Sequence, residues 1–294
     1  MSTHANYRFW LRLASRAAVV TALLLIALKT WAWLASGSVS LLAGLTDSLM
    51  DGLASLLNLI AVQIALKPAD REHRFGHGKA EALAGLAQAA FITGSSALVA
   101  LQAADRLLHP KPLAATDLAI GVIVISLVMT LALVTLQKVA YARTQSTAIA
   151  ADSLHYRSDI LLNVGILLAL WASSFGWALL DPIAGLLIAA YILLSAWSIV
   201  RHALKVLMDE ELGEDIRQHI LSLARSTPGV HGAHDLRTRS AGADWFIQLH
   251  LELDGQISLE QAHCHCDAVE QAIKAAYPQA QVLLHADPPS ALRR

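Results

Sequence analysis

The sequence predicts an α-helical membrane protein with six transmembrane helices and a C-terminal cytoplasmic α+β domain. Three observations lead to this fold class. Apolar residues make up 55% of the 294 residues and charged residues only 15%, whereas about 25% of a typical soluble domain is charged. The long apolar runs all lie before residue 201. Residues 209–294 instead have the mixed composition of an ordinary soluble domain.

Six apolar stretches are long enough to cross a bilayer as helices, which requires about 20 residues each. Turn-forming or charged segments such as SGS, KPADREHRFGHGK and SFGW separate them. The predicted spans are Ala17–Ala35, Val39–Leu66, Ala80–Leu108, Leu118–Leu136, Ala148–Ser173 and Trp177–Val200. No cleavage-site pattern follows the first span, so we expect a retained helix. We therefore predict a transmembrane domain over residues 1–208 and a second domain over 209–294.

Lys and Arg residues are unevenly divided between the two sets of loops. The loops on one side hold Arg8, Arg12, Arg16, Lys67, Arg71, Arg74, Lys79, Lys138, Arg143, Arg201 and Lys205. The opposite loops offer only Arg106 and Lys111. Cytoplasmic loops carry the excess of positive charge in membrane proteins. We therefore predict that both chain ends, and with them the C-terminal domain, lie in the cytoplasm.

Two pairs of polar residues interrupt the apolar spans. LTDSLMD places Asp47 and Asp51, the only charged residues of the second span, four positions apart, and ADSLHYRSDILLN does the same for His155 and Asp159. Residues four apart share a helix face, and acids inside a membrane usually mark a site or pathway. Three carboxylates and one imidazole suit a divalent transition metal. Alternatively, any one of these residues lines a water-filled cavity or pairs with Lys29.

Several other classes of function find little support. No His-Glu-x-x-His motif stands in any span and no nucleophile lies beside a base, which argues against a membrane metallohydrolase or another enzyme. A net charge of −1 gives no support to nucleic-acid binding. Cys264 and Cys266 are too few for a disulfide scaffold; we expect Cys266 to be a small core residue. Asp152 and Asp181 lie nearer to the span ends, where we expect them at the membrane interface.

A charged loop joins the second and third spans. ADREHRFGHGKAE contains Asp70, His73 and His77. Two histidines four apart with an acid nearby can bind zinc. A solvated basic loop that enforces the membrane orientation is an equally good interpretation of the spacing.

The C-terminal region predicts a helix, two strands, a helix and a third strand. GEDIRQHILSLARS is typical of a helix, VHGAHDLRTR and ADWFIQLHLELD of a hairpin, and QVLLHAD of a strand. Between them, residues 258–277 form an amphipathic helix with Ser258 as its cap. Alternation in the second strand places Ile247, Leu249 and Leu251 on one face and Phe246 and His250 on the other.

Together these motifs resemble the cation diffusion facilitator family, and specifically its bacterial zinc- and iron-exporting branch. The match runs from about Phe9 to Asp287 and includes LTDSLMDGLASLLN, HRFGHGKAEALA and ADSLHYRSDILLN. The resemblance implies a homodimeric metal–proton antiporter of the bacterial inner membrane with a metallochaperone-like cytoplasmic domain. It places a transport site on Asp47, Asp51, His155 and Asp159, a second metal site on Asp70, His73 and His77, and a two-metal cluster on His234, His250, His263, His285 and Asp287. Lys79 and Asp209 match positions of charge contacts in the family's dimer.

The resemblance also predicts the substrate. A His in the fifth-span pair accompanies zinc and cadmium preference in this family, and an Asp there accompanies manganese. His155 therefore favours Zn²⁺, with Cd²⁺ and Fe²⁺ as further candidates, and no organic cofactor is expected. Because metal and protons compete for the same ligand atoms, we predict one or two protons exchanged per metal, with His155 as main carrier. The alternatives are a manganese-selective exporter and a membrane-anchored metal sensor that uses only the cytoplasmic cluster.

Overall fold

The computed structural model describes residues 3–37, 39–108, 117–173 and 180–288. Contacts within the chain divide it into two compact units. One unit consists of Tyr7–Lys67 and Ala80–Leu204, and the other of Met1–Asn6, Pro68–Lys79 and Lys205–Arg294. The loop between the second and third spans thus belongs to the same unit as the C-terminal region. The domain boundary predicted after residue 208 remains a proposal.

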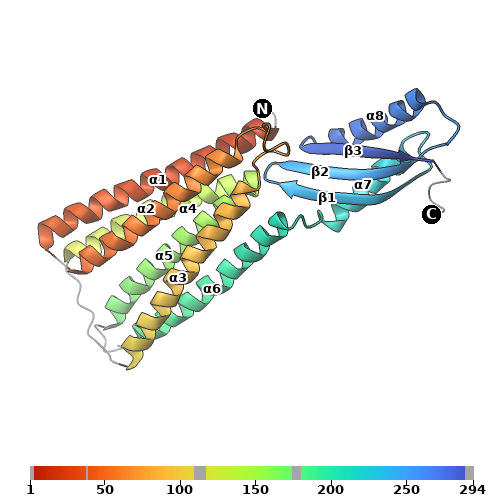
Figure 1. The fold of residues 1–294 in the computed structure, drawn as a ribbon. Coiled ribbons are helices and arrows are strands. Elements are labelled where there is room, and N and C mark those ends of the chain that lie inside the picture. Colours follow the sequence, from red (N-terminus) through yellow and green to blue (C-terminus); the bar gives the residue numbers. More distant parts are fainter. Residues whose placement is uncertain (1–2, 38, 109–116, 174–179, 289–294) are drawn as a thin grey trace. The chain divides into compact units, whose positions relative to one another are not determined.

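Six long helices form the first unit, and successive helices run in opposite directions (Figure 1). They are α1 (Thr3–Ser36), α2 (Val39–Ala65), α3 (Ala80–Leu108), α4 (Asp117–Thr144), α5 (Thr147–Ser173) and α6 (Leu180–Leu207). By length and composition, five of them could cross a membrane, and α5, which carries Asp152, Arg157 and Asp159, is not among these five. The prediction of a helical membrane protein is confirmed. Lys111 and Trp177 lie outside the described residues.

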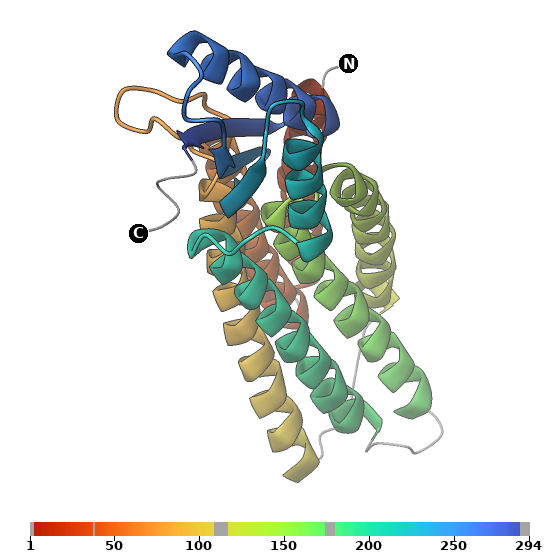
Figure 2. The ribbon, with the colours of Figure 1, turned by 90° about the vertical axis from the view of Figure 1, so that its right-hand side faces the viewer.

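Tight packing joins α5, which holds one of the two polar pairs, to α3 and α6. α3 and α6 run side by side (Figure 1, Figure 2) and share with α5 a buried cluster that includes Ile92, Leu154 and Ile192. At Gly85 in α3, an added Cβ would lie 2.7 Å from the Cγ2 atom of Thr147 at the start of α5. Any larger residue at this position would therefore force the Thr147 side chain to move.

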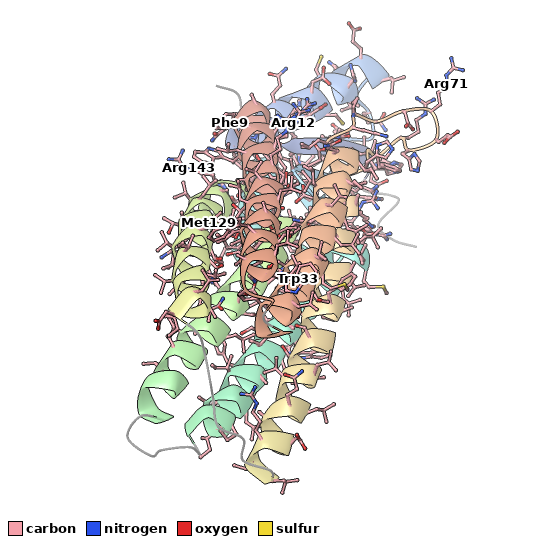
Figure 3. The ribbon with its side chains drawn as sticks, turned by 90° about the vertical axis from the view of Figure 1, so that its left-hand side faces the viewer. Phe9, Arg12, Trp33, Arg71, Met129 and Arg143 are labelled. Atoms are coloured by element: carbon pink, nitrogen blue, oxygen red, sulfur yellow. The ribbon has the colours of Figure 1, made fainter. Side chains whose placement is uncertain are left out.

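Basic side chains gather at one end of the helical unit. Arg12 of α1 and Arg143 of α4 lie toward the same end, whereas Trp33 lies toward the other end of α1 (Figure 3). The Arg143 guanidinium is 5.8 Å from the ring centre of Trp10, which confirms that these helix ends are neighbours. Residues predicted to share one side of the membrane thus share one end of the bundle, and which side is cytoplasmic remains a prediction.

A buried carboxylate joins three segments of this unit. Glu81 in the first turn of α3 is 4% exposed, and the Tyr7 hydroxyl of α1 donates to its Oε1 atom at 2.5 Å. The Ser146 hydroxyl, just before α5, donates to the other carboxylate oxygen. Both oxygens therefore have the hydrogen-bond partners that a buried carboxylate requires.

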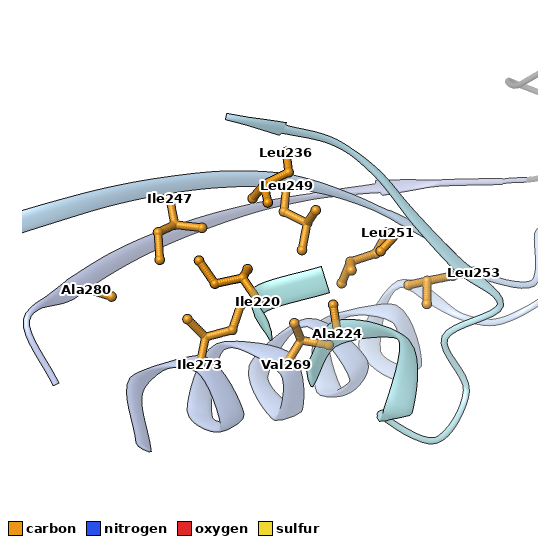
Figure 4. Packing of buried hydrophobic residues seen from close by; sticks show 11 residues of the cluster. Ile220, Ala224, Leu236, Ile247, Leu249, Leu251, Leu253, Val269, Ile273 and Ala280 are labelled. Carbon is orange, nitrogen blue, oxygen red and sulfur yellow. The ribbon is translucent and has the colours of Figure 1, made fainter. Parts of the chain in front are cut away.

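The second unit contains a three-stranded sheet with the order β1-β2-β3, formed by β1 (Gly232–Ala241), β2 (Asp244–Glu252) and β3 (Ala280–Asp287). β1 pairs antiparallel and β3 parallel with β2. α7 (Glu214–Ser226) and α8 (Leu259–Ala276) pack against one face (Figure 4). The core comprises Ile220, Ile247, Leu249, Leu251, Val269 and Ile273 among others. The predicted αββαβ order is confirmed, as is the Ser258 cap, which forms a capping box with Gln261.

Side chains of α8 and β2 test which residues were predicted to face the core of this unit. Cys266 is partly buried and packs against the core, as predicted, and Cys264 is exposed. Phe246, predicted on the polar face of its strand, is only 7% exposed. It does lie on the face opposite the core residues Ile247, Leu249 and Leu251, as predicted. Its burial was not predicted, and it arises because the Phe75 ring lies edge-on to it at 5.4 Å and the Arg239 guanidinium lies 5.0 Å from its centre.

Candidate metal centres

The first candidate centre lies where α2 and α5 meet inside the helical unit. The Nε2 atom of His155 is 3.0 Å from Oδ1 of Asp51. Asp159, one turn further along α5, completes a group whose ligand atoms all lie within 4.8 Å of one another. His155 is only 8% exposed. Three of the four residues predicted for the transport site are thus brought together, and we refer to them as the intramembrane group.

Asp47, the fourth predicted ligand, lies outside this group. It is exposed, one helical turn from Asp51, and interacts electrostatically with Asp51 and Lys29. The Lys29 ammonium donates a hydrogen bond of 3.0 Å to the Gly44 carbonyl. The role of Asp47 as a ligand remains a prediction.

A second contact between the same two helices lies beside the intramembrane group. Tyr156, adjacent to His155, is 1% exposed, and its hydroxyl oxygen is 2.8 Å from the Ser55 hydroxyl. Ser55 follows Asp51 by one turn on α2. The same Tyr156 hydroxyl lies 3.3 Å from the Ala18 carbonyl of α1. The spacing of α2 and α5 at the group therefore depends on a buried hydroxyl pair as well as on the ligands.

Asp152 is a buried acid beside the intramembrane group. It is 1% exposed, and its Oδ2 atom accepts a 2.7 Å hydrogen bond from the Gln137 amide of α4. Its position at the membrane interface remains a prediction. Its spacing of three residues from His155, which places both on one helix face, is the signal that could have indicated burial. The side chain of Asp181 lies outside the described residues.

The second candidate centre is the loop group of Asp70, His73 and His77, which the structure brings together as predicted. His73 Nδ1 and His77 Nε2 each lie 3.4 Å from an oxygen of the Asp70 carboxylate. The backbone amides of His73 and Glu72 donate to this carboxylate at 2.7 and 3.0 Å. These bonds, that of His73 foremost, lower the pKa of Asp70 below its ordinary value, so the carboxylate is ionised and available to a cation.

Close contacts fix this loop against β1 of the same unit. An added Cβ on Gly78 would lie 2.1 Å from the carbonyl oxygen of Ala241, so only glycine fits. Lys79 Nζ lies 2.8 Å and Arg239 Nη1 3.2 Å from the two carboxylate oxygens of Asp209. Burial alone would raise the pKa of Asp209, but its hydrogen bonds and ion pairs with Lys79 and Arg239 hold it below the ordinary value.

The third candidate centre lies on the sheet. The strand register places His234, His250 and His285 side by side across β1, β2 and β3. His250 Nδ1 is 2.7 Å and His234 Nε2 is 3.6 Å from Oδ2 of Asp287, and these three residues form a group within 4.8 Å. His285 Nε2 is 3.1 Å from the other oxygen of Asp287. We call His234, His250, His285 and Asp287 the cytoplasmic cluster.

His263 is not brought to this cluster in the described chain. Its side chain is 72% exposed on α8, and its nearest acid is Asp267 at 3.5 Å. Leu249 and Leu251 face α7 and α8 in the core, so His250 between them points to the opposite face of the sheet. α8 therefore lies on the wrong face for His263 to join this row within the chain. Its role as a ligand remains a prediction.

All three groups fit a divalent transition metal by their chemistry. Each combines imidazole nitrogen with carboxylate oxygen, a donor set that Zn²⁺ takes in proteins. Imidazole also suits iron, whereas sites built from oxygen alone suit manganese and magnesium. The groups differ in what holds their ligands: two helices, one loop and three strands.

Comparison with known proteins agrees with this organisation. Residues 15–208 match the cation efflux transmembrane domain and residues 212–289 the cation efflux protein cytoplasmic domain. The cation-efflux pump FieF of Shewanella oneidensis is 51% identical over 288 residues, which are 98% of this chain and 97% of the relative. FieF of Klebsiella pneumoniae is 48% identical over 284 residues, which are 95% of this chain and 94% of the relative.

Among solved structures, CzrB in its Zn form is 32% identical, and the match covers 28% of this chain and 94% of the CzrB chain, with a TM-score of 0.27. Both domain models and relatives of almost equal length show that this membrane protein belongs to the cation efflux, or cation diffusion facilitator, family.

Proposed function

We propose that this protein exports a divalent cation of the zinc class in exchange for protons, through the intramembrane group together with Asp47. The contact between His155 and Asp51, at 3.0 Å and with Asp159 in reach, is the observation that carries the proposal. It joins two separate helices of a chain whose relatives are named cation-efflux pumps. The transported metal is the substrate of this group.

Competition for the same atoms supports exchange with protons. A protonated His155 would form an ion pair with Asp51 at the observed distance. A metal ion needs the neutral imidazole nitrogen and ionised carboxylates instead. Metal binding on one side of the membrane therefore releases protons from the group, and metal release on the other side allows the ligands to take up protons there. We propose one or two protons per metal.

The ligand set favours Zn²⁺, with Cd²⁺ and Fe²⁺ as further substrates. Imidazole is a better ligand for these ions than for Mn²⁺, which prefers oxygen donors. His155→Asp should therefore shift the preference from zinc toward manganese. If the wild-type protein transports manganese faster than zinc, the alternative of a manganese-selective exporter replaces this part of the proposal.

Proteoliposomes provide the direct test of the exchange. We expect Zn²⁺ flux in the wild type that increases with an opposing proton gradient, no flux with Asp159→Asn, and wild-type flux with Asp117→Asn. Asp117 is a matched control because it is an exposed acid in the first turn of α4. Undiminished flux with Asp159→Asn, or flux independent of pH from about 5.5 to 8 across the usual imidazole titration range, would contradict the proposal.

A membrane-anchored metal sensor is the second candidate, and the assembled cytoplasmic cluster favours it. His234, His250 and Asp287 meet without any residue of the helical unit. A sensor predicts that Asp51→Ala leaves the zinc tolerance of cells unchanged, whereas an exporter predicts loss of tolerance. Growth in graded zinc, with expression of both proteins measured, separates the two functions.

The wider setting follows from the loop charges and the family. We propose a homodimer in the bacterial inner membrane with both chain ends in the cytoplasm. We also propose that the loop group and the cytoplasmic cluster hold resident zinc, which regulates transport. Accessibility of single cysteines introduced near residues 3 and 288, measured in intact cells and in inverted vesicles, tests the orientation.

A further inference from the structure

Two neighbouring rows of side chains cross the open face of the sheet. His234, His250 and His285 form one row, and Gly232, Glu252 and Asp287 occupy the next, two positions along. Positions two apart on a strand share a face. Glu252 therefore lies beside the cytoplasmic cluster, although it is not one of the residues whose ligand atoms form the group.

The two ring nitrogens of His234 are directed toward different carboxylates. Its Nδ1 atom lies 3.2 Å from Oε1 of Glu252, and its Nε2 atom lies 3.6 Å from Oδ2 of Asp287. Asp287 belongs to the cluster and Glu252 does not. The Nδ1 side of the ring is thus occupied by an acid outside the cluster, which leaves the Nε2 side directed toward the metal-binding atoms.

Gly232, on the neighbouring strand, lies directly beside the Glu252 carboxylate. A Cβ added to Gly232 would lie 2.5 Å from both Cδ and Oε2 of the Glu252 carboxylate. The backbone of Gly232 is not in the left-handed region, so its conformation does not require glycine. The missing side chain instead leaves the space that the carboxylate fills.

We propose that Glu252 is a positioning residue of the cytoplasmic cluster. Its carboxylate lies 3.2 Å from Nδ1 of His234, an atom without a hydrogen-bond partner among the described residues, and a small rotation would let it accept the Nδ1–H and so present Nε2 to a bound divalent metal. Gly232 supplies the space in which this carboxylate lies. Histidine ligands commonly donate their second ring N–H to a carboxylate, which fixes both tautomer and ring orientation. The inference rests on the proposed function only in that the cluster binds a metal ion.

Zinc affinity of the full-length protein tests this role. In a background where Asp51→Ala and His73→Ala disable the other two groups, the zinc dissociation constant is measured by competition with a chelating dye. Glu252→Ala should weaken binding about 10–100-fold, the usual effect of losing such a partner. Glu252→Gln, which keeps an acceptor oxygen, should recover part of the affinity. Glu260→Ala, an exposed acid on α8, is the matched control and should bind as tightly as the background.

Gly232→Ala separates positioning from charge, because it displaces the Glu252 carboxylate without removing it. It should weaken zinc binding alone and add no further loss to Glu252→Ala, where no carboxylate remains to be displaced. The visible spectrum of bound Co²⁺ should change with Glu252→Ala and not with Glu260→Ala.

Unchanged zinc affinity and an unchanged Co²⁺ spectrum in Glu252→Ala would overturn the proposal. So would full additivity of the two substitutions. If Gly232→Ala does not fold, the zinc affinities of Glu252→Ala and Glu252→Gln still test whether the Glu252 carboxylate positions His234. Failure of the proposed transport would appear separately, as absent zinc flux in wild-type proteoliposomes.

Discussion

The intramembrane group and the cytoplasmic cluster use the same ligand types on different supports. In the first, Asp51 and His155 come from two separate helices that contact each other here through side chains. In the second, His250 and Asp287 sit on neighbouring strands whose register is fixed by backbone hydrogen bonds. Ligand distances in the intramembrane group therefore change whenever α2 and α5 shift, while those on the sheet do not.

This difference indicates different roles for the two sites. A site with ligands on movable helices can bind an ion in one arrangement and release it in another, which alternating access requires. A site on a hydrogen-bonded sheet keeps its geometry and suits a resident ion. The exposed fractions of the two side chains agree with these roles: the His155 side chain is 10% exposed, whereas the His234 side chain is 34% exposed.

The largest expected effect separates the two sites directly. His155→Ala should abolish zinc transport, a loss beyond the roughly 10–100-fold typical of outer-shell changes, because it removes a ligand of the transported ion. His250→Ala, the same substitution in the cytoplasmic cluster, should leave measurable transport. Zinc uptake into inverted vesicles, normalised to protein amount, provides the comparison. Equal losses in both variants would erase the proposed distinction.

Removing two ligands of the cytoplasmic cluster should have a smaller effect than His155→Ala, on dimer stability or on the apparent zinc affinity of transport. His234→Ala combined with His250→Ala should weaken the dimer or lower the apparent zinc affinity of transport, because the resident ion can no longer stabilise the domain. Sedimentation in detergent with and without zinc measures the first, and flux against zinc concentration the second. If neither quantity changes, the cluster does not regulate transport.

The hydroxyl contact between α2 and α5 should matter less than the ligands. Tyr156→Phe removes the buried hydrogen bond between the Tyr156 and Ser55 hydroxyls, at a cost of about 1–3 kcal/mol. We expect reduced thermal stability and weaker zinc binding at the intramembrane group. Ser55→Ala should add little in this background, because both changes remove one shared contact. Tyr191→Phe, on an exposed face of α6, is the control; an equal effect there would contradict the assignment.

A smaller effect is expected from the ion pairs of Asp209, and it depends on pH. Because its pKa is lowered by Lys79 and Arg239, the stabilisation is fully present above its ordinary value of 3.8 and is lost as pH falls through the lowered folded value. The groups are partly exposed, so at most about 1 kcal/mol is involved. The melting temperatures of wild type and Asp209→Asn should differ at pH 7 and converge in acid. A difference independent of pH would argue against this ion-pair contribution.

The cysteines should have the smallest effect of all. Burial, and then the charge of Asp267, raise the pKa of Cys266, which disfavours its thiolate, while Cys264 is exposed. A thiol reagent should therefore label Cys264 faster than Cys266, and zinc should change neither rate. Strong zinc protection of both thiols would show a soft-metal site that the account lacks.

Helix positions could be predicted where polarity changes sharply. α2 and α3 begin where expected, because SGS and the charged loop mark their ends. α1 and α4 extend beyond their predicted spans, since the helical backbone continues past the apolar segment into residues such as Arg12 and Lys138. Hydropathy detects the membrane-spanning part of a helix and not its polar extension.

Side-chain environments created by distant segments could not be predicted. Asp152 is buried because Gln137 of another helix donates to it, and Phe246 because Phe75 of the loop covers it. Pair spacing predicted Asp51, His155 and Asp159, which the structure brings together. The separate position of Asp47 depends on how α2 packs, and spacing within one helix does not contain that information. Glu252 was overlooked because its contact with His234 requires the register of β1 and β2.

X-ray absorption of zinc bound to the intramembrane group alone is the most direct test of the account. It requires the full-length protein with the loop group and the cytoplasmic cluster disabled by His73→Ala, His234→Ala and His250→Ala. The account predicts a four-coordinate ion at about 2.0–2.1 Å from nitrogen and oxygen donors, with imidazole scattering that disappears in His155→Ala. A six-oxygen shell without imidazole, or a signal unaffected by His155→Ala, would show that these side chains do not share an ion.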